Sequence, residues 1–110
     1  MQKAGIQVSL FDDPDEPQIE AATKIGAAAV ELPTGEYADN GDIAPLQRAA
    51  AYAAAAGLSV HAGHGLRVDN AAAVARLPEI SELNIGHAIV ARALFVGLRA
   101  ATKEMAEVIK

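Results

Sequence analysis

The chain has 110 residues, of which 52% are hydrophobic, and this length is typical of one small domain or part of a larger one. It has no cysteine, which excludes disulfides and thiolate metal sites. Its net charge of −5, without any run of Lys or Arg, argues against nucleic acid and anionic membranes as partners. No apolar stretch reaches the ~20 residues of a membrane span and the N-terminus does not resemble a signal peptide, so we expect a soluble, cytoplasmic protein with a thin, alanine-rich core.

Predicted strands and helices alternate four times along the chain. Residues 5–11 alternate apolar and polar side chains, as a half-buried strand does. Asp15 is expected to cap a helix that runs to about Lys24 and ends at Gly26. A second strand is predicted at 27–32.

A long, turn-rich loop is predicted at 33–42, before the second helix. Asp42 is expected to cap that helix, which continues through the alanines at 49–56 and stops at Gly57. The third strand is predicted at 58–62.

The last part of the chain is expected to hold a short helix, a strand and a long helix. The short helix begins at Asp69 or Asn70 and is closed by Pro78, and the fourth strand is predicted at 81–85. The long helix has apolar residues at steps of three and four, which predict one apolar stripe: Val90, Leu94, Leu98, Ala101, Met105 and Val108.

Strands that alternate with helices predict parallel βα units. One face of the predicted strands is apolar and should meet the helices: Ile6, Val8, Leu10, Val30, Leu32, Leu58, Val60, Leu83 and Ile85. The other face is polar: Gln7, Ser9, Glu31, Ser59, His61 and Asn84. An open doubly wound sheet meets helices on both faces and should be apolar on both. The polar face therefore favours an α/β fold that is half of a (β/α)8 TIM-type barrel over a small flavodoxin-like sheet.

Four βα units cannot close such a barrel, because the first and fourth strands remain open edges. We expect residues 1–110 to form a single half-barrel unit. It should pair with a second copy of itself, as a homo-oligomer, or with a complementary half.

Glu31 is a candidate for chemistry because barrel enzymes carry their reacting groups at the C-terminal ends of strands. A carboxylate inside an apolar strand costs free energy unless it is paired or hydrated. A structural ion pair is one explanation. The polar barrel mouth favours a functional glutamate, since desolvation makes the group a tunable acid or base.

Two histidines lie at the end of the third strand, in LSVHAGHG (58–65). His64 stands between two glycines, which allow a ligand to approach closely, and a histidine can exchange protons near neutral pH. A loop histidine without a role explains the pattern equally well. His61 is expected to line the polar face. The spacing is not specific for zinc, so no metal site is predicted.

The segment NIGHA (84–88) joins the fourth strand to the last helix, with Gly86 at the turn and His87 at the helix start. Backbone N–H groups at a helix N-terminus bind anions, and barrels often bind phosphate after their last strands. A phosphate site is therefore predicted here, with a plain tight turn as the alternative.

Four segments, AGIQVSLF, VELPTGEYAD, VHAGHGL and ELNIGHAIVARALFVGL, resemble the pyridoxine 5'-phosphate synthase family. The resemblance runs along nearly the whole chain and corresponds to barrel strands five to eight, the C-terminal half of the family. It implies an oligomeric, cytoplasmic transferase of vitamin B6 biosynthesis. The implied reaction condenses 3-amino-2-oxopropyl phosphate with 1-deoxy-D-xylulose 5-phosphate, without metal or organic cofactor.

The resemblance also implies roles for individual residues. Glu31 would stabilise charge during ring closure, and His64 would donate a proton. Gly65, Gly86 and His87 would hold the phosphate of the aminoketone substrate.

The chain departs from the family at Pro33, where the family has histidine, and at His61, where it has asparagine. The N-terminal half of the family, with a second catalytic glutamate, has no counterpart in these 110 residues. Because the condensation needs several proton transfers and two phosphates held together, we expect negligible synthase activity from the isolated chain. The alternatives are a self-associating half-barrel that only binds phosphate-bearing ligands, and a poorly folded fragment.

Overall fold

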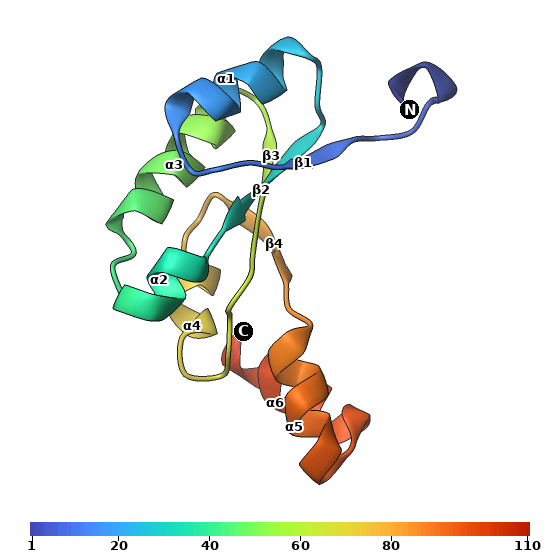
Figure 1. Ribbon diagram of the computed structural model, residues 1–110, viewed down its shortest axis with the longest axis vertical. Coiled ribbons are helices and arrows are strands. Elements are labelled where there is room, and N and C mark those ends of the chain that lie inside the picture. Colours follow the sequence, from blue (N-terminus) through green and yellow to red (C-terminus); the bar gives the residue numbers. More distant parts are fainter.

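The computed structural model describes residues 1–110 as a four-stranded sheet with helices packed along one side (Figure 1). The strands are β1 (Ser9–Phe11), β2 (Ala29–Pro33), β3 (Ser59–Gly63) and β4 (Ile80–Asn84). The helices are a short 3-10 helix (Gln2–Ala4), α1 (Glu16–Lys24), α2 (Gly35–Asn40), α3 (Ala44–Ala55), α4 (Ala71–Ala75), α5 (His87–Val96) and α6 (Leu98–Val108). No helix combines the length and the apolar character that crossing a membrane requires.

All neighbouring strands are parallel, and their spatial order, β1-β2-β3-β4, is their order in the chain. A flavodoxin-like sheet would instead reverse its order at a switch point and carry helices on both faces. Here α1, α3 and α4 lie on the same side of the sheet (Figure 1). The α/β class with four βα units is confirmed, and the arrangement is consistent with half of a TIM-type barrel.

The core lies between the sheet and these helices. Val30 on β2 pairs with Leu10 on β1 and with Val60 on β3, so apolar side chains of adjacent strands share the helix-facing side. Helix residues that complete the core include Ile19 of α1 and Met105 of α6. Only 20 of the 110 residues are buried, and many of them are alanines, so the core is thin, as the composition predicts.

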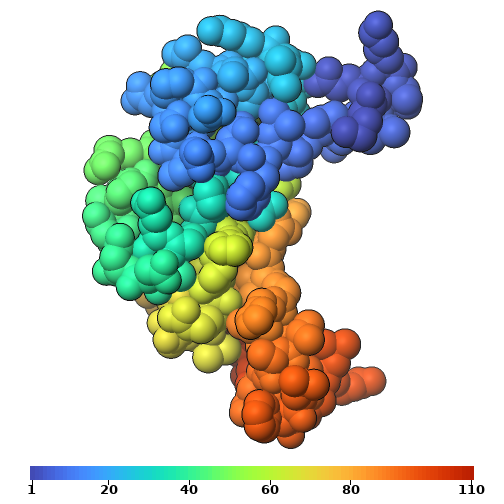
Figure 2. Space-filling model, viewed as in Figure 1, coloured from blue at the N-terminus to red at the C-terminus, as the bar shows by residue number.

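The opposite face of the sheet is polar and carries no helix. Glu31 on β2 pairs with His61 on β3, and His61 pairs with Glu82 on β4, so these three side chains form one row across the sheet. The molecule is a crescent, with α1, α3 and α4 on its convex side and a hollow between the N-terminal segment and α5, which form its two ends (Figure 1 and Figure 2).

Most predicted helix ends are confirmed. One carboxylate oxygen of Asp15 accepts the Gln18 N–H at 3.0 Å, which caps α1. The N-cap of α3 is Ile43 and not the predicted Asp42, although the Asp42 carboxylate accepts the Ala44 N–H at 3.0 Å just before the helix. Gly57, just after α3, has φ +86°, a conformation that glycine adopts without steric cost.

The prediction of a loop at 33–42 is wrong, because this segment contains α2. Gly41 ends the helix with φ +75°, and its N–H donates to the Tyr37 carbonyl. The Tyr37 hydroxyl donates to the Asn70 carbonyl at 2.8 Å, which ties α2 to the loop after β3. The tertiary contact outweighs the turn-forming composition of the segment.

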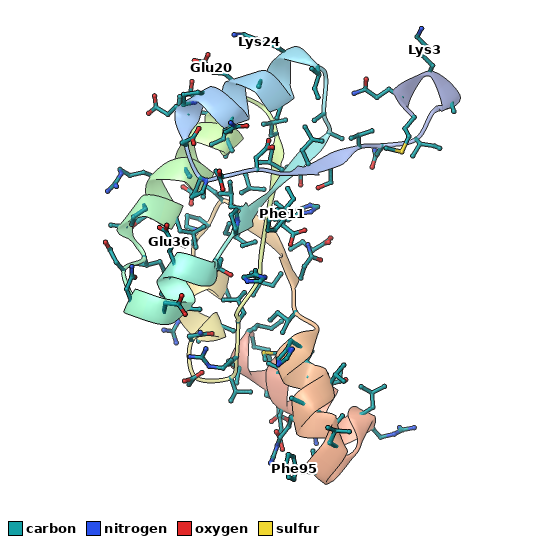
Figure 3. All side chains as sticks on the ribbon, viewed as in Figure 1. Lys3, Phe11, Glu20, Lys24, Glu36 and Phe95 are labelled. Carbon is teal, nitrogen blue, oxygen red and sulfur yellow. The ribbon has the colours of Figure 1, made fainter.

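The prediction of a single long C-terminal helix is also wrong. Gly97 has φ +84° and ψ 154°, a region that only glycine populates readily, and it divides the segment into α5 and α6. The predicted apolar stripe is therefore split. Leu94 on α5 is 83% exposed, whereas Met105 on α6 is buried in the core. Phe95 lies exposed at the far end of α5 (Figure 3).

The first strand is shorter than the predicted 5–11. Only Ser9–Phe11 pair with β2, and Ile6 is exposed instead of facing the helices. The residues before Val8 extend past the start of β2 and have no strand beside them. The Gln2 side chain donates to the Ile25 carbonyl at 3.0 Å and holds the N-terminal turn against the end of α1.

Candidate functional site

The carboxyl ends of β3 and β4 and the start of α5 surround a cavity of about 1030 Å³. Because parallel strands all end at one edge of a sheet, residues far apart in the sequence meet here. Four of the five predicted site residues line this cavity: His64, Gly65, Gly86 and His87. Glu31 is connected to it through Asn84, which lines the cavity and binds the Glu31 carboxylate.

Glu31 is half-buried on the polar face and is held by an uncharged partner. The Asn84 amide donates to Glu31 Oε2 at 2.8 Å, and no Lys or Arg forms an ion pair with this carboxylate. Gly63 leaves the space that the carboxylate needs, since a Cβ there would overlap Glu31 Oε1 and lie 2.9 Å from the Asn84 carbonyl oxygen. The structural ion pair considered from the sequence is therefore not present.

His64 is the only non-glycine residue with a positive φ, at +85°. This conformation costs of the order of 1–3 kcal/mol and persists only where the surroundings enforce it. The imidazole is exposed and lies over Gly35, the first residue of α2, where a Cβ would be 3.1 Å from His64 Cδ2. Such strain is typical of functional sites.

Thr34 was not identified from the sequence, although it lies beside this histidine. It is the one polar side chain in the buried set. Its N–H donates to the Gly63 carbonyl at 2.7 Å, and its hydroxyl lies within hydrogen-bonding reach of the carbonyls of Gly63 and His64. The only sequence signal was a threonine directly after a strand and before a glycine.

His61 has different neighbours from His64. Its Nδ1 lies 3.8 Å from Glu82 Oε1, and its Nε2 lies 3.4 Å from the Ser59 hydroxyl. His61 thus belongs to the polar row of the sheet, as predicted, while His64 belongs to the loop. Nowhere in the chain do three His, Cys, Asp or Glu side chains gather in a way that could hold a metal ion.

The N-terminus of α5 forms one wall of the cavity. Gly86 is its N-cap and His87 its first residue, and no side chain caps the free N–H groups. Two arginines of the wall are already paired: Arg67 with Asp69 at 3.0 Å, and Arg92 with Glu104 at 2.9 Å. The hydrogen bond with Arg92 also lowers the pKa of Glu104.

A second cavity of about 350 Å³ lies on the other side of His64, between the loop after β1 and α2. Its lining is acidic and aromatic and includes Phe11, Asp13, Glu36 and Tyr37 (Phe11 and Glu36 are labelled in Figure 3). In the same loop, one buried carboxylate oxygen of Asp12 has no hydrogen-bond partner. Burial, followed by the neighbouring charges, raises the pKa of Asp12.

Comparisons with known proteins give one consistent result. A family model described as "Pyridoxal phosphate biosynthesis protein PdxJ" matches residues 1–110. A pyridoxine 5'-phosphate synthase from Magnetococcus marinus is 55% identical over 109 residues, which cover 93% of this chain and 45% of that protein.

Two further relatives with the same name agree. The protein from a Sulfurihydrogenibium species is 47% identical over 115 residues, covering 99% of this chain and 47% of its own length. The protein from Coxiella burnetii is 48% identical over 110 residues, covering 94% of this chain and 46% of its own length. The chain thus spans about half the length of the curated relatives it matches.

Proposed function

The chain belongs to the PdxJ family of pyridoxal phosphate biosynthesis proteins, and on this premise we propose that it supplies the C-terminal half of a pyridoxine 5'-phosphate synthase barrel. One observation carries the proposal. His64, the amide that binds Glu31 and the uncapped N-terminus of α5 meet at one cavity at the carboxyl ends of the strands. This is the part of a barrel at which enzymes carry out their chemistry.

The substrates in this proposal are 3-amino-2-oxopropyl phosphate and 1-deoxy-D-xylulose 5-phosphate, as the sequence resemblance implies. The phosphate of the first binds at Gly65, Gly86 and His87. The uncapped start of α5 supports this, because free N–H groups at a helix N-terminus attract anions. The pairing of both wall arginines with carboxylates leaves the backbone as the main anion-binding element of this wall.

His64 donates a proton to an oxygen that leaves during the condensation. Its exposed imidazole, on the rim of both cavities, supports this role. Glu31 stabilises positive charge as the ring closes, and its carboxylate is bound by an amide, so no Lys or Arg side chain competes with the reacting group for it.

A complementary N-terminal half completes the barrel in this proposal. β1 and β4 each have one unpaired edge, and the polar face of the sheet has no covering element. The missing partner strands would pair with both edges and enclose the polar face as the barrel interior. The assembled protein works in the cytoplasm as an oligomer and needs no metal or organic cofactor.

A chimera tests this proposal directly. These 110 residues replace the matching C-terminal part of the Magnetococcus marinus synthase, and pyridoxine 5'-phosphate formation is measured. We expect product from the chimera and about a 10²- to 10⁴-fold loss in His64→Asn, the range for removing an acid or base group. Glu31→Gln should lose about 10²- to 10³-fold, the range for removing a group that stabilises charge. A folded chimera without activity would contradict the proposal.

Two control variants show whether the loss is specific. Glu82→Gln changes another carboxylate on the same face of the sheet, and His61→Asn changes the other histidine of the segment to the residue that the family has there. Both are expected to keep near-normal activity. Equal loss in the controls would mean that charge on the sheet face, and not the two named residues, matters.

A further inference from the structure

Thr34 contacts the backbone on both sides of the His64 Cα atom. The backbone dihedrals of a residue are set by the two peptide planes that flank it. The Gly63 carbonyl belongs to the plane before His64, and the His64 carbonyl belongs to the plane after it. Thr34, which directly follows β2 as the N-cap of α2, reaches these carbonyls across 29 and 30 residues of sequence.

The donors of Thr34 match these two carbonyls. Its N–H donates to the Gly63 oxygen at 2.7 Å, so the single hydroxyl hydrogen is free for the His64 oxygen. Thr34 is completely buried, and its hydrogen bonds therefore face little competition from water. Together the two donors fix the orientation of both peptide planes.

The conformation held in this way costs a histidine free energy. His64 has φ +85°, where a side chain other than that of glycine is strained. Neighbouring glycines accommodate the imidazole and the turn: a Cβ at Gly35 would press on the ring, and a Cβ at Gly65 would lie 2.9 Å from Ala38 Cβ. A glycine at position 64 would fit without strain but would lack the imidazole.

We propose that Thr34 is a positioning residue that holds His64 in its left-handed backbone conformation and so aims the imidazole at the mouth of the barrel. The inference rests on the proposed function for the use of the imidazole. The geometry itself, two donors on two carbonyls that flank a strained histidine, stands independently of the reaction.

Two substitutions distinguish the effect of the Thr34 hydroxyl from the effect of the side-chain volume. Thr34→Val keeps the shape and the N–H but removes the hydroxyl, whereas Thr34→Ser keeps the hydroxyl. In the 110-residue chain, the Cε1–H NMR resonance of His64 should shift in Thr34→Val and return close to its original position in Thr34→Ser. The resonances of His61 and His87 should stay unchanged and serve as internal references.

In the chimera, Thr34→Val should lower kcat by about tenfold or more with little change in KM, and Thr34→Ser should restore most of the activity. Wild-type resonances and kcat in Thr34→Val, or a Thr34→Ser variant as impaired as Thr34→Val, would overturn the proposal. A wild-type chimera that makes no product, while the His64 resonance still responds as expected, would instead refute the proposed function alone.

A double variant covers the case in which Thr34→Val destabilises the chain. Glycine adopts a positive φ without support, so His64→Gly should reduce the loss in melting temperature that Thr34→Val causes. An undiminished loss in the His64→Gly background would show that Thr34 does not act through His64.

Discussion

At the scale of single residues, Gly63 and Asn84 explain how Glu31 lies on the sheet without a cationic partner. The carboxylate crosses β3 at the point where glycine leaves space, and the amide from β4 binds its far side. A full side chain at position 63 would displace the carboxylate or move the strand. Residues of β3 and β4 thus determine the position of the Glu31 side chain, which comes from β2.

Gly63→Ala is expected to disturb Glu31 and the fold together. The new Cβ would meet the Glu31 carboxylate and the Asn84 backbone, and such overpacking costs about 1–3 kcal/mol. Urea unfolding measures the loss. The stability control is Gly86→Ala, because a Cβ at Gly86 meets nothing within 4 Å and its φ of −124° is ordinary. Equal losses in both variants would contradict this view of Gly63.

The raised pKa of Asp12 predicts how the stability of the chain depends on pH. Its pKa is raised above the usual 3.8, by burial first and then by Asp13 and Asp15, so the folded state holds its proton more tightly than the unfolded state. The charged group therefore costs stability at neutral pH, and this cost disappears as the pH falls below 3.8.

Asp12→Asn should raise the free energy of unfolding at neutral pH, and the gain should vanish in acid. Denaturant unfolding at several pH values checks this, with Asp13→Asn as the control for the loss of one negative charge. A gain in Asp12→Asn that is independent of pH, or one no larger than in Asp13→Asn, would refute the assigned cause.

The residue scale also shows what the sequence could reveal. The alternation of apolar and polar residues within the strands predicted that Glu31 lies on the polar face. The glycines that directly follow predicted strands indicated that His64 and Gly86 lie at the strand ends. The roles of Thr34 and Asn84 could not be found in this way. Their partners lie 29 to 53 residues away and depend on which strands are neighbours.

At the scale of elements, two predictions failed for different reasons: α2 replaces a predicted loop, and a glycine divides the predicted C-terminal helix. The six-residue helix α2 has no side-chain cap, and the hydrogen bond from Tyr37 to the Asn70 carbonyl helps to hold it. The division between α5 and α6 depends on one glycine conformation. Arg92 of α5 and Glu104 of α6 then pair across the two helices, at distances of 2.9 and 3.0 Å.

Tyr37→Phe should loosen α2 by leaving the Asn70 carbonyl without its donor. We expect a loss of about 0.5–1.5 kcal/mol, the usual net value of one hydrogen bond, and faster amide exchange in α2 than in α3. Tyr52→Phe is the matched control, since the Tyr52 hydroxyl binds the exposed Glu20 carboxylate at 2.9 Å. An equal loss in both variants would mean that the Tyr37 bond has no special role.

At the scale of the whole molecule, the crescent has the features of an incomplete barrel. Both outer strands have unpaired edges, the polar sheet face is uncovered, and few residues are buried. Exposed edges favour association, because unpaired N–H and C=O groups can pair with another strand. The polar face was predictable from two-residue alternation, and the strand order followed from the rule that successive βα units lie side by side.

The central claim is that these 110 residues carry one half of a synthase site whose other half lies in the N-terminal part of the barrel. The most direct test mixes the chain with a separately produced N-terminal half of the Magnetococcus marinus synthase and measures pyridoxine 5'-phosphate. We predict no product from either half alone and clear product from the mixture. Product from the isolated chain, or none from a mixture of two folded halves, would contradict the claim.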